Sequence, residues 1–252
     1  MEPTLYCDPR TRVPLALSGD ALVNPETGRR YQIREGIPIF FDGVTGLNRK
    51  YQTMYDRLSY GYDFAERAYK WIVRKPDHRL DYIKELEIGA GARVLEVSVG
   101  TGANLAYLPG DAELFGLDLS WGMLRYCRRN LIKWKRAAQI CQGEAEHLPF
   151  PDAAFDCVFH VGGINFFNDK AGAIQEMIRV ARPGTKIVIV DETAQVITGD
   201  YRMNPMTRKY FEGVSGDAAT CPIDLVPAEM TSVEAHGIAR GKLYCLTFRT
   251  PV

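Results

Sequence analysis

The stretch VLEVSVGTGAN at residues 94–104 carries the strongest local signal in this chain. It begins as a short apolar strand rich in valine and leads directly into a turn of small residues. Small residues let the backbone approach a ligand closely, and the free N–H groups at the start of a helix can receive a carboxylate. The stretch therefore predicts a ligand-binding loop between a strand and a helix at about residues 102–108.

The spacing of the glycines separates this loop from a dinucleotide-binding loop. The dinucleotide fingerprint Gly-x-Gly-x-x-Gly would need a third glycine after Gly100 and Gly102, where Leu105 stands. Asp118 lies 16 positions after Gly102, at the expected end of the next strand, where a carboxylate can accept hydrogen bonds from both hydroxyls of a ribose. The alternative is that Asp118 only caps the following helix, although Ser120 is the better N-cap candidate.

Strand-like and helical runs alternate around the loop. The strand-like runs are 93–97, 113–117, 138–142, 155–159 and 186–190, and helices are expected at about 102–108, 120–135 and 169–181. Such alternation predicts a doubly wound, mostly parallel α/β sheet. Two further runs, 232–239 and 242–249, predict a closing antiparallel hairpin. We therefore expect one domain with a seven-stranded sheet over residues 91–252.

The first 90 residues divide into two parts. Residues 1–45 are rich in turn residues and contain short strand-like runs, which predict a small β-rich appendage. Residues 46–90 predict a helical lid. Its helical spacing begins at about residue 47 and runs through Tyr51, Met54, Tyr55 and Leu58, and further helices are expected at about 64–73 and 77–86.

Length and composition limit the class of protein. A chain of 252 residues accommodates one α/β domain and a small appendage. The 31 basic residues balance the 31 acidic ones, so no global charge attracts nucleic acid. No apolar run approaches the roughly 20 residues that cross a bilayer, and the N-terminus lacks a secretory signal pattern. With six scattered cysteines, these features predict a cytoplasmic enzyme with no nucleic-acid partner and no integral membrane segment.

Five motifs stand in order from residue 95 to residue 184. They are LExxxGTG at 95–102, GLDLSxxML at 116–124, GEAExLPF at 143–150, FD at 155–156 and ExxRVxRPG at 176–184. Together they resemble the UbiE-like (methyltransferase type 11) branch of the class I S-adenosylmethionine-dependent methyltransferases. The resemblance implies a Rossmann-like fold, S-adenosyl-L-methionine as the cofactor, S-adenosyl-L-homocysteine as its product, and methyl transfer to an aromatic, quinone-like or lipid-like acceptor.

The resemblance also assigns roles to individual residues. The loop from Glu96 to Gly102 would surround the methionine part of the cofactor, and Asp118 would hold its ribose. The expected cofactor-binding residues are Tyr55, Tyr62, Glu96, Val97, Ser98, Gly100, Thr101, Gly102, Asn104, Asp118, Leu119, Met123, Glu144, Ala145, Glu146 and His160. Among them, Leu119 and Met123 would line the adenine pocket. Ser98 departs from the family pattern, because it replaces the first glycine of the loop and so reduces backbone freedom.

Three of these residues could do more than line a pocket. Tyr55 and Tyr62 could donate hydrogen bonds to the cofactor and stabilise its sulfonium through their rings, or they could form a core-facing aromatic stripe. His160 follows the fourth strand-like run and is the candidate catalytic residue. It could deprotonate the acceptor, because an imidazole titrates near neutrality, or it could only line the site.

Residues 5–41 resemble a Trm112-type zinc ribbon whose metal ligands have been lost. The two Cys-x-x-Cys pairs of a ribbon are replaced by Cys7 with Arg10 and by Asn24 with Thr27. One thiolate cannot build a four-ligand zinc site, so we expect no metal. We expect the appendage to enclose the substrate or to form a contact in a homodimer.

Two other functions stay open on the sequence alone. One is a non-catalytic S-adenosylmethionine-binding regulatory or partner subunit, and the other is a NAD-type oxidoreductase, which the glycine spacing disfavours. In methyl transfer the cofactor carries the reactivity, and the protein supplies alignment and excludes water. No universal catalytic residue can therefore be identified from the motifs.

Overall fold

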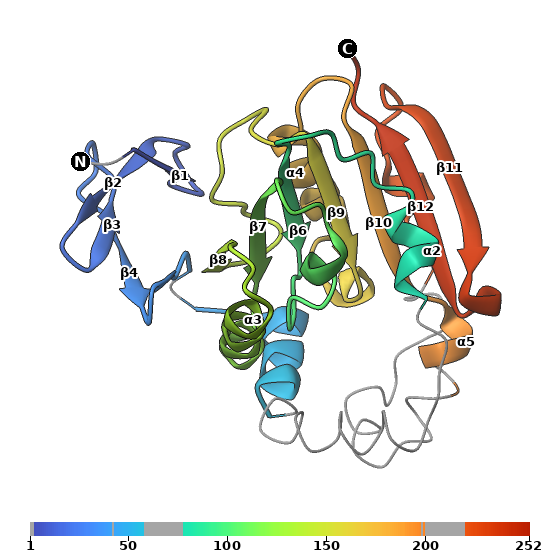
Figure 1. Ribbon diagram of the computed structural model, residues 1–252, viewed down its shortest axis with the longest axis horizontal. Coiled ribbons are helices and arrows are strands. Elements are labelled where there is room, and N and C mark those ends of the chain that lie inside the picture. The colour runs from blue at the N-terminus through green and yellow to red at the C-terminus, as the bar shows by residue number, and fades with distance from the viewer. Residues whose placement is uncertain (1–2, 42, 58–77, 198, 200–219) are drawn as a thin grey trace.

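The computed structural model describes residues 3–41, 43–57, 78–197, 199 and 220–252, and these residues form two sheets (Figure 1). The N-terminal sheet has five antiparallel strands in the order β1-β2-β3-β4-β5. The large sheet has seven strands in the order β11-β12-β10-β9-β6-β7-β8. The predicted α/β fold with a β-rich N-terminal part is confirmed.

The large sheet is parallel except at its last two strands. Its parallel strands are β6 (Arg93–Val97), β7 (Glu113–Asp118), β8 (Gln139–Gln142), β9 (Cys157–Val161) and β10 (Lys186–Glu192). The predicted C-terminal hairpin, β11 (Thr231–Ile238) and β12 (Leu243–Arg249), adds antiparallel to β10. The fourth strand lies two residues later than predicted, because Phe155 forms only an isolated bridge with Ala181.

Helices cover both faces of this sheet. Leu95 and Val97 of β6 point into one core together with Ile174 and Met177 of α4 (Lys170–Val180). Val94 of β6 points into the other core, which it shares with α3 (Trp121–Trp134). Alternation of side chains along a strand explains why one short strand supplies both cores. Within the large sheet, the chain runs from β6 outward to β7 and β8 and then returns to place β9 on the other side of β6. The carboxyl ends of β6 and β9 are thus the topological switch point, where open α/β sheets bind ligands.

The helix predicted over residues 102–108 is wrong. The structure has only a 3₁₀ turn there, η1 (Leu105–Tyr107). Gly100 and Gly102 adopt φ angles of 52° and 72°, in a left-handed region that interrupts an α-helix. Pro109 follows shortly and cannot donate a helical hydrogen bond. The segment after β6 is therefore a series of turns that ends in a 3₁₀ turn and not in an α-helix.

The segment predicted as a lid is described in part. Residues 46–57 are helical, and α2 (Arg79–Ile83) is shorter than the predicted helix at 77–86. The predicted helix at 64–73 lies outside the described residues. The remaining short elements are η2 (Ile164–Phe166), α5 (Ala194–Val196), η5 (Ile223–Leu225) and η6 (Ala239–Gly241).

The N-terminal sheet consists of β1 (Pro3–Cys7), β2 (Pro14–Ser18), β3 (Ala21–Val23), β4 (Arg30–Arg34) and β5 (Ile37–Pro38). It lies beside β8 in Figure 1, and its aromatic residues join the core of the large domain. The ring centroid of Tyr6 is 5.1 Å from that of Phe40 and 5.5 Å from that of Phe150.

Hydrogen bonds of Asp8 and Asn24 hold together the two turns that contain positions 7–10 and 24–27. The buried Asn24 donates from Nδ2 to Asp8 Oδ2 at 2.8 Å. Asp8 also accepts from the backbone N–H of Arg10, and Asn24 accepts from that of Glu26, so each side chain holds its own turn. Among the described residues, no group of three or more His, Cys, Asp or Glu side chains is placed to hold a metal ion.

We expect Asn24→Ala to lower the free energy of unfolding by about 2 kcal/mol, because the buried Asp8 carboxylate loses its side-chain donor. Chemical denaturation of wild type and variant measures the difference. A chelator should leave the melting temperature of the wild type unchanged. Stoichiometric zinc in the purified protein would contradict both expectations.

Candidate cofactor and substrate site

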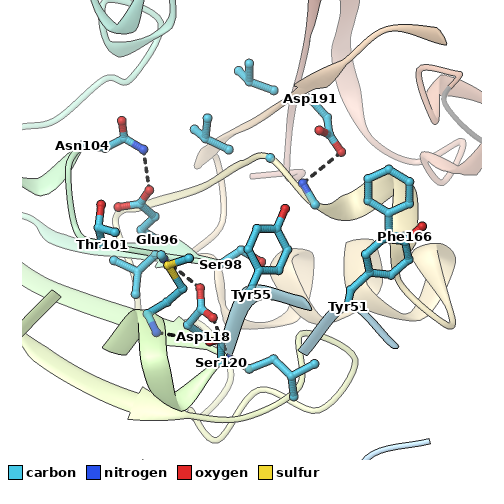
Figure 2. A pocket seen from close by; sticks show the side chains of 18 of the residues that line it. Tyr51, Tyr55, Glu96, Ser98, Thr101, Asn104, Asp118, Ser120, Phe166 and Asp191 are labelled. Atoms are coloured by element: carbon cyan, nitrogen blue, oxygen red, sulfur yellow. Dashed lines mark hydrogen bonds between the residues drawn. The ribbon is translucent and has the colours of Figure 1, made fainter. Parts of the chain in front are cut away.

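A cavity of about 380 Å³ opens at the carboxyl ends of β6, β7, β9 and β10. This size falls within the range of small-molecule sites. Loops that follow the four strands form most of its wall, and residues 46–57 contribute Asn48, Tyr51, Gln52 and Tyr55. Figure 2 shows Tyr55 between the side with Glu96 and Asp118 and the side with Phe166 and Asp191.

The loop after β6 is held in a tight conformation. Ser98, which stands where the family has glycine, adopts a φ of 62°, a left-handed value that residues other than glycine rarely take. The backbone N–H of Val99 donates to the carbonyl of Leu117 at 2.9 Å, which fixes the loop to β7. A Cβ atom on Gly102 would lie 2.7 Å from Cys127 Sγ in α3. The serine therefore preserves the loop geometry at the cost of local backbone strain.

Glu96 presents a buried carboxyl group at the cavity wall. Its side chain is 1% exposed, and Asn104 Nδ2 donates to Oε1 at 2.6 Å. The Tyr82 hydroxyl donates to Asn104 Oδ1 at 2.7 Å, which fixes the orientation of the amide. Within the described part of the chain, Oε2 has no hydrogen-bond partner. Burial raises the pKa of Glu96 to about 8, so the group is suited to a cationic ligand that would repay its desolvation.

Asp118 joins the two loops that border the cavity. Its Oδ2 accepts from the backbone N–H of Gly100, and its Oδ1 accepts from that of Ser120, both at 2.8 Å. Burial raises the pKa of this carboxyl to about 6. Ser120 is the N-cap of α3, since its Oγ accepts from the N–H of Met123 at 3.2 Å. The carboxylate of Asp118 is therefore not needed as the N-cap of α3, and it can hold the loop and bind a ligand in the cavity.

The structure brings many of the sequence-predicted residues to one cavity. Those that border it are Tyr55, Glu96, Ser98, Gly100, Thr101, Asn104, Asp118, Leu119 and Met123. Val97, Gly102, Glu144, Ala145, Glu146 and His160 do not border it. Tyr62 lies outside the described residues. Glu144 and Glu146 instead accept hydrogen bonds from Asn48 Nδ2, at 3.1 and 3.0 Å. They therefore anchor the start of the helical stretch 46–57.

His160 is enclosed within the large sheet, with no exposed surface. Its Nδ1 lies 3.0 Å from the carbonyl of Val97, and the backbone N–H of Ile164 donates to its Nε2 at 3.0 Å. These partners require a neutral ring with the proton on Nδ1. Burial lowers the pKa of His160 to about 4. Both nitrogens are already engaged, which favours a structural role over the alternative of a general base.

Residues that the sequence analysis missed form the other side of the cavity. Asp191 is the second-to-last residue of β10 and accepts from the backbone N–H groups of Gly163 and Asn165, at 3.1 and 2.9 Å. Tyr51 stacks on Phe166 with ring centroids 4.4 Å apart. The signal for Asp191 was available, because like Asp118 it follows a run of apolar residues in a parallel strand and lies at the carboxyl edge of the sheet. The stacked pair joins two segments more than 100 residues apart, so no local pattern could have indicated it.

Comparison with known proteins agrees with this geometry. The chain matches the methyltransferase domain family over residues 95–189. It is 28% identical over 154 residues to a ubiquinone/menaquinone biosynthesis C-methyltransferase UbiE of Geotalea daltonii, a match that covers 59% of this chain and 65% of that protein. It is 30% identical over 198 residues to the UbiE protein of Hahella chejuensis, which covers 76% of this chain and 71% of the relative. The chain thus spans a little under two thirds of the length of the first of these relatives.

A solved structure shows the same fold. Phosphoethanolamine N-methyltransferase 2 of Haemonchus contortus, in complex with S-adenosyl-L-methionine, aligns with a TM-score of 0.60 at 18% identity, over 85% of this chain and 62% of that one. No helix in the described part of the chain is long and apolar enough to cross a membrane. The match to the Hahella protein agrees with the glycine loop after β6 and with the aspartate that ends β7. The chain therefore belongs to the UbiE-like branch of the class I S-adenosylmethionine-dependent methyltransferases.

Proposed function

We propose that this chain transfers a methyl group from S-adenosylmethionine to a small-molecule acceptor with an aromatic, quinone-like or other apolar body. The observation that carries the proposal is the pair of buried carboxyl groups, Glu96 and Asp118, that border one cavity at the switch point of the sheet. One of the four carboxyl oxygens, Glu96 Oε2, is buried without a hydrogen-bond partner among the residues that the structure describes. A cationic ligand would stabilise the buried carboxylate, because an ionised carboxyl in an apolar site needs a hydrogen-bond donor or a positive charge beside it.

The cavity wall offers partners for each part of the cofactor. Asp118 would accept hydrogen bonds from the ribose, as the end of β7 does in nucleotide-binding α/β folds. Leu119, in the turn before α3, and Met123, in α3 itself, would contact the adenine. Glu96 would lie near the methionine part, whose ammonium group supplies the missing charge. When bound, S-adenosylmethionine supplies an electrophilic methyl group on a sulfonium.

The opposite side of the cavity supports an acceptor with an apolar body. The Tyr51–Phe166 stack, Phe167 and Leu243 border it there. Burial raises the pKa of Tyr55 well above its usual value, so its hydroxyl stays a neutral hydrogen-bond donor. Aromatic side chains bind flat apolar rings through area and favourable ring geometry. The names of the UbiE relatives point the same way, since those proteins act in ubiquinone and menaquinone biosynthesis.

The residues of this chain would act by alignment. Asp118 and Glu96 orient the cofactor, Tyr55 lies between the two sides of the cavity, and the aromatic stack excludes water from the acceptor side. Alignment of two reactants can supply a large part of the rate enhancement without a proton-transferring residue. The direct test combines calorimetry of S-adenosylhomocysteine binding with a methyl-transfer assay on a hydroquinone panel and an aliphatic amine panel. Turnover on amines alone would refute the acceptor class, and absence of binding would refute the whole proposal.

The pKa of Glu96 predicts a pH dependence of binding. Below pH 8 the free protein carries Glu96 largely protonated, and a bound ammonium group favours the ionised form, so binding releases a proton. We expect the affinity for S-adenosylhomocysteine to rise between pH 6 and pH 8, by up to about tenfold per unit. Calorimetry at several pH values measures this rise. Glu96→Gln should remove the dependence between pH 7 and pH 8, whereas a dependence near pH 6, where Asp118 titrates, should remain. A wild-type affinity that is flat from pH 6 to 8 would contradict the assignment.

A further inference from the structure

The N-terminal β unit (residues 3–41) extends the large sheet beyond β8. Ile39 forms a parallel bridge with Gln142, and the backbone N–H of Phe40 donates to the Gln142 carbonyl at 2.8 Å. Ile37 packs into the core on the α3 side and Phe40 into the core on the α4 side, as expected for alternating residues of a strand. Residues 37–40 therefore cover what would otherwise be an open sheet edge.

Other contacts attach the β unit to the domain at separate points. Arg12 donates from Nη2 to Glu176 Oε1 at 2.7 Å and from Nη1 to the Leu148 carbonyl at 3.1 Å. The guanidinium of Arg34 lies over the ring of Trp121, 4.7 Å from its centroid, in the first turn of α3. No residue from 3 to 41 borders the cavity among the described residues. Enclosure of the substrate by these residues therefore has no support in the structure.

Hydrogen bonds connect the covered edge at β8 to the side of the cavity where Asp118 and Leu119 lie. Gln142, which the β unit holds through its backbone, donates from its side-chain Nε2 to the Leu119 carbonyl at 2.9 Å. Gln52 of the helical stretch 46–57 donates to the same carbonyl at 3.1 Å. Leu119 borders the cavity and follows Asp118, whose carbonyl accepts from the N–H of Gly143 at 3.1 Å. A short chain of hydrogen bonds thus joins Phe40 to the end of β7.

The helical stretch 46–57 follows the β unit closely in the chain, and side chains of the large domain hold its start. Only five residues separate Phe40 from residue 46, and Asn48 is fixed by Glu144 and Glu146. Asn168 accepts from the backbone N–H of Leu47 at 2.8 Å and so holds the first turn. This helical stretch then supplies Gln52 and Tyr55 to the cavity wall.

We propose that the N-terminal β unit is a built-in partner of the methyltransferase domain that raises the affinity of the cofactor pocket, with Gln142 as the positioning residue between them. The inference rests on the proposed function, because it needs a cofactor that binds at Asp118 and Leu119. Docking of the β unit on β8 orders Gln142, and Gln142 in turn orders the Leu119 carbonyl. Coupling of this kind is reciprocal, so cofactor binding must strengthen the docking by the same factor.

The first test weakens the docking away from the cavity. Arg12→Ala/Arg34→Ala removes two side chains that join the β unit to the domain. The control Arg30→Ala/Lys133→Ala removes the same charge from exposed positions, since Arg30 lies near Asp20 within the β unit, at 3.9 Å, and Lys133 is exposed on α3. We expect S-adenosylhomocysteine to bind the first variant at least fivefold more weakly than wild type, and the control within twofold.

The second test measures the reciprocal effect in the full chain. Hydrogen exchange at the Phe40 amide should slow at least fivefold when S-adenosylhomocysteine is bound, because that N–H donates across the docked edge. Gln142→Leu keeps the backbone acceptor for Phe40 but removes the bond to Leu119. We expect this variant to bind the ligand more weakly, and its Phe40 exchange no longer to respond to the ligand.

The outcomes separate the two proposals. If wild type binds no S-adenosylhomocysteine, the proposed function is wrong and the coupling falls with it. If wild type binds it, but Arg12→Ala/Arg34→Ala binds equally well or Phe40 exchange is unchanged by the ligand, the coupling alone is wrong. If the double variant does not fold, the exchange measurement on wild type and Gln142→Leu decides.

Discussion

Replacement of Asp118 by alanine is expected to weaken the binding of S-adenosylhomocysteine at least tenfold. The proposed ribose contact consists of two hydrogen bonds to a charged group, each worth about 1.5–3 kcal/mol. A tenfold loss corresponds to about 1.4 kcal/mol, so the estimate is conservative. The variant also loses the hydrogen bonds that Asp118 accepts from the backbone N–H groups of Gly100 and Ser120, and this loss loosens the loop around the site.

The control for this experiment is Asp111→Ala. Asp111 is an exposed aspartate in the loop before β7, and it accepts only from the backbone N–H of Gly91. We expect its variant to bind S-adenosylhomocysteine as wild type does. Asp118→Asn should show an intermediate loss, because an amide oxygen still accepts one hydrogen bond. Unchanged affinity of Asp118→Ala in calorimetry would refute the ribose assignment.

Replacement of His160 by alanine is expected to lower the free energy of unfolding by about 3 kcal/mol. The variant leaves the carbonyl of Val97 and the N–H of Ile164 buried without partners, and each unsatisfied group costs about 1–3 kcal/mol. Turnover per folded molecule should stay within about threefold of wild type. A general base would instead lose about 10²–10⁴-fold.

The low pKa of His160 also makes the stability of the folded protein depend on pH. Its folded-state pKa of about 4 lies below the value near 6.5 in the unfolded chain, so the unfolded state binds the proton more strongly. The contribution of this histidine to stability is present above pH 6.5 and is lost as the pH falls toward 4. His160→Gln can keep one of the two hydrogen bonds and should reduce this loss. A His160→Gln variant with a 100-fold lower turnover would restore the general-base hypothesis.

The strands and the loop of the site were determined by local sequence. The boundaries of β6 are those that the apolar run at 93–97 predicts, and Asp118 and Ser120 lie at the end of β7 and at the N-cap of α3 as expected. These features depend on side-chain periodicity and on hydrogen bonds between near neighbours. Both can be recognised from residues that are close together in the sequence. The location of the site follows from them, because parallel strands bring their carboxyl ends to one edge.

Other features of the site were decided only by the tertiary structure. Glu144 and Glu146 match the family motif, yet in the folded chain they hold Asn48, which lies nearly 100 residues earlier. The backbone groups that engage both nitrogens of His160 come from β6 and from η2, and no pattern around residue 160 specifies both of them. The docking of the N-terminal β unit on β8 depends on contacts with residues more than 100 positions away in the sequence. Sequence periodicity reports which face of an element is apolar, whereas the partner that covers a buried polar group is chosen by packing across the whole chain.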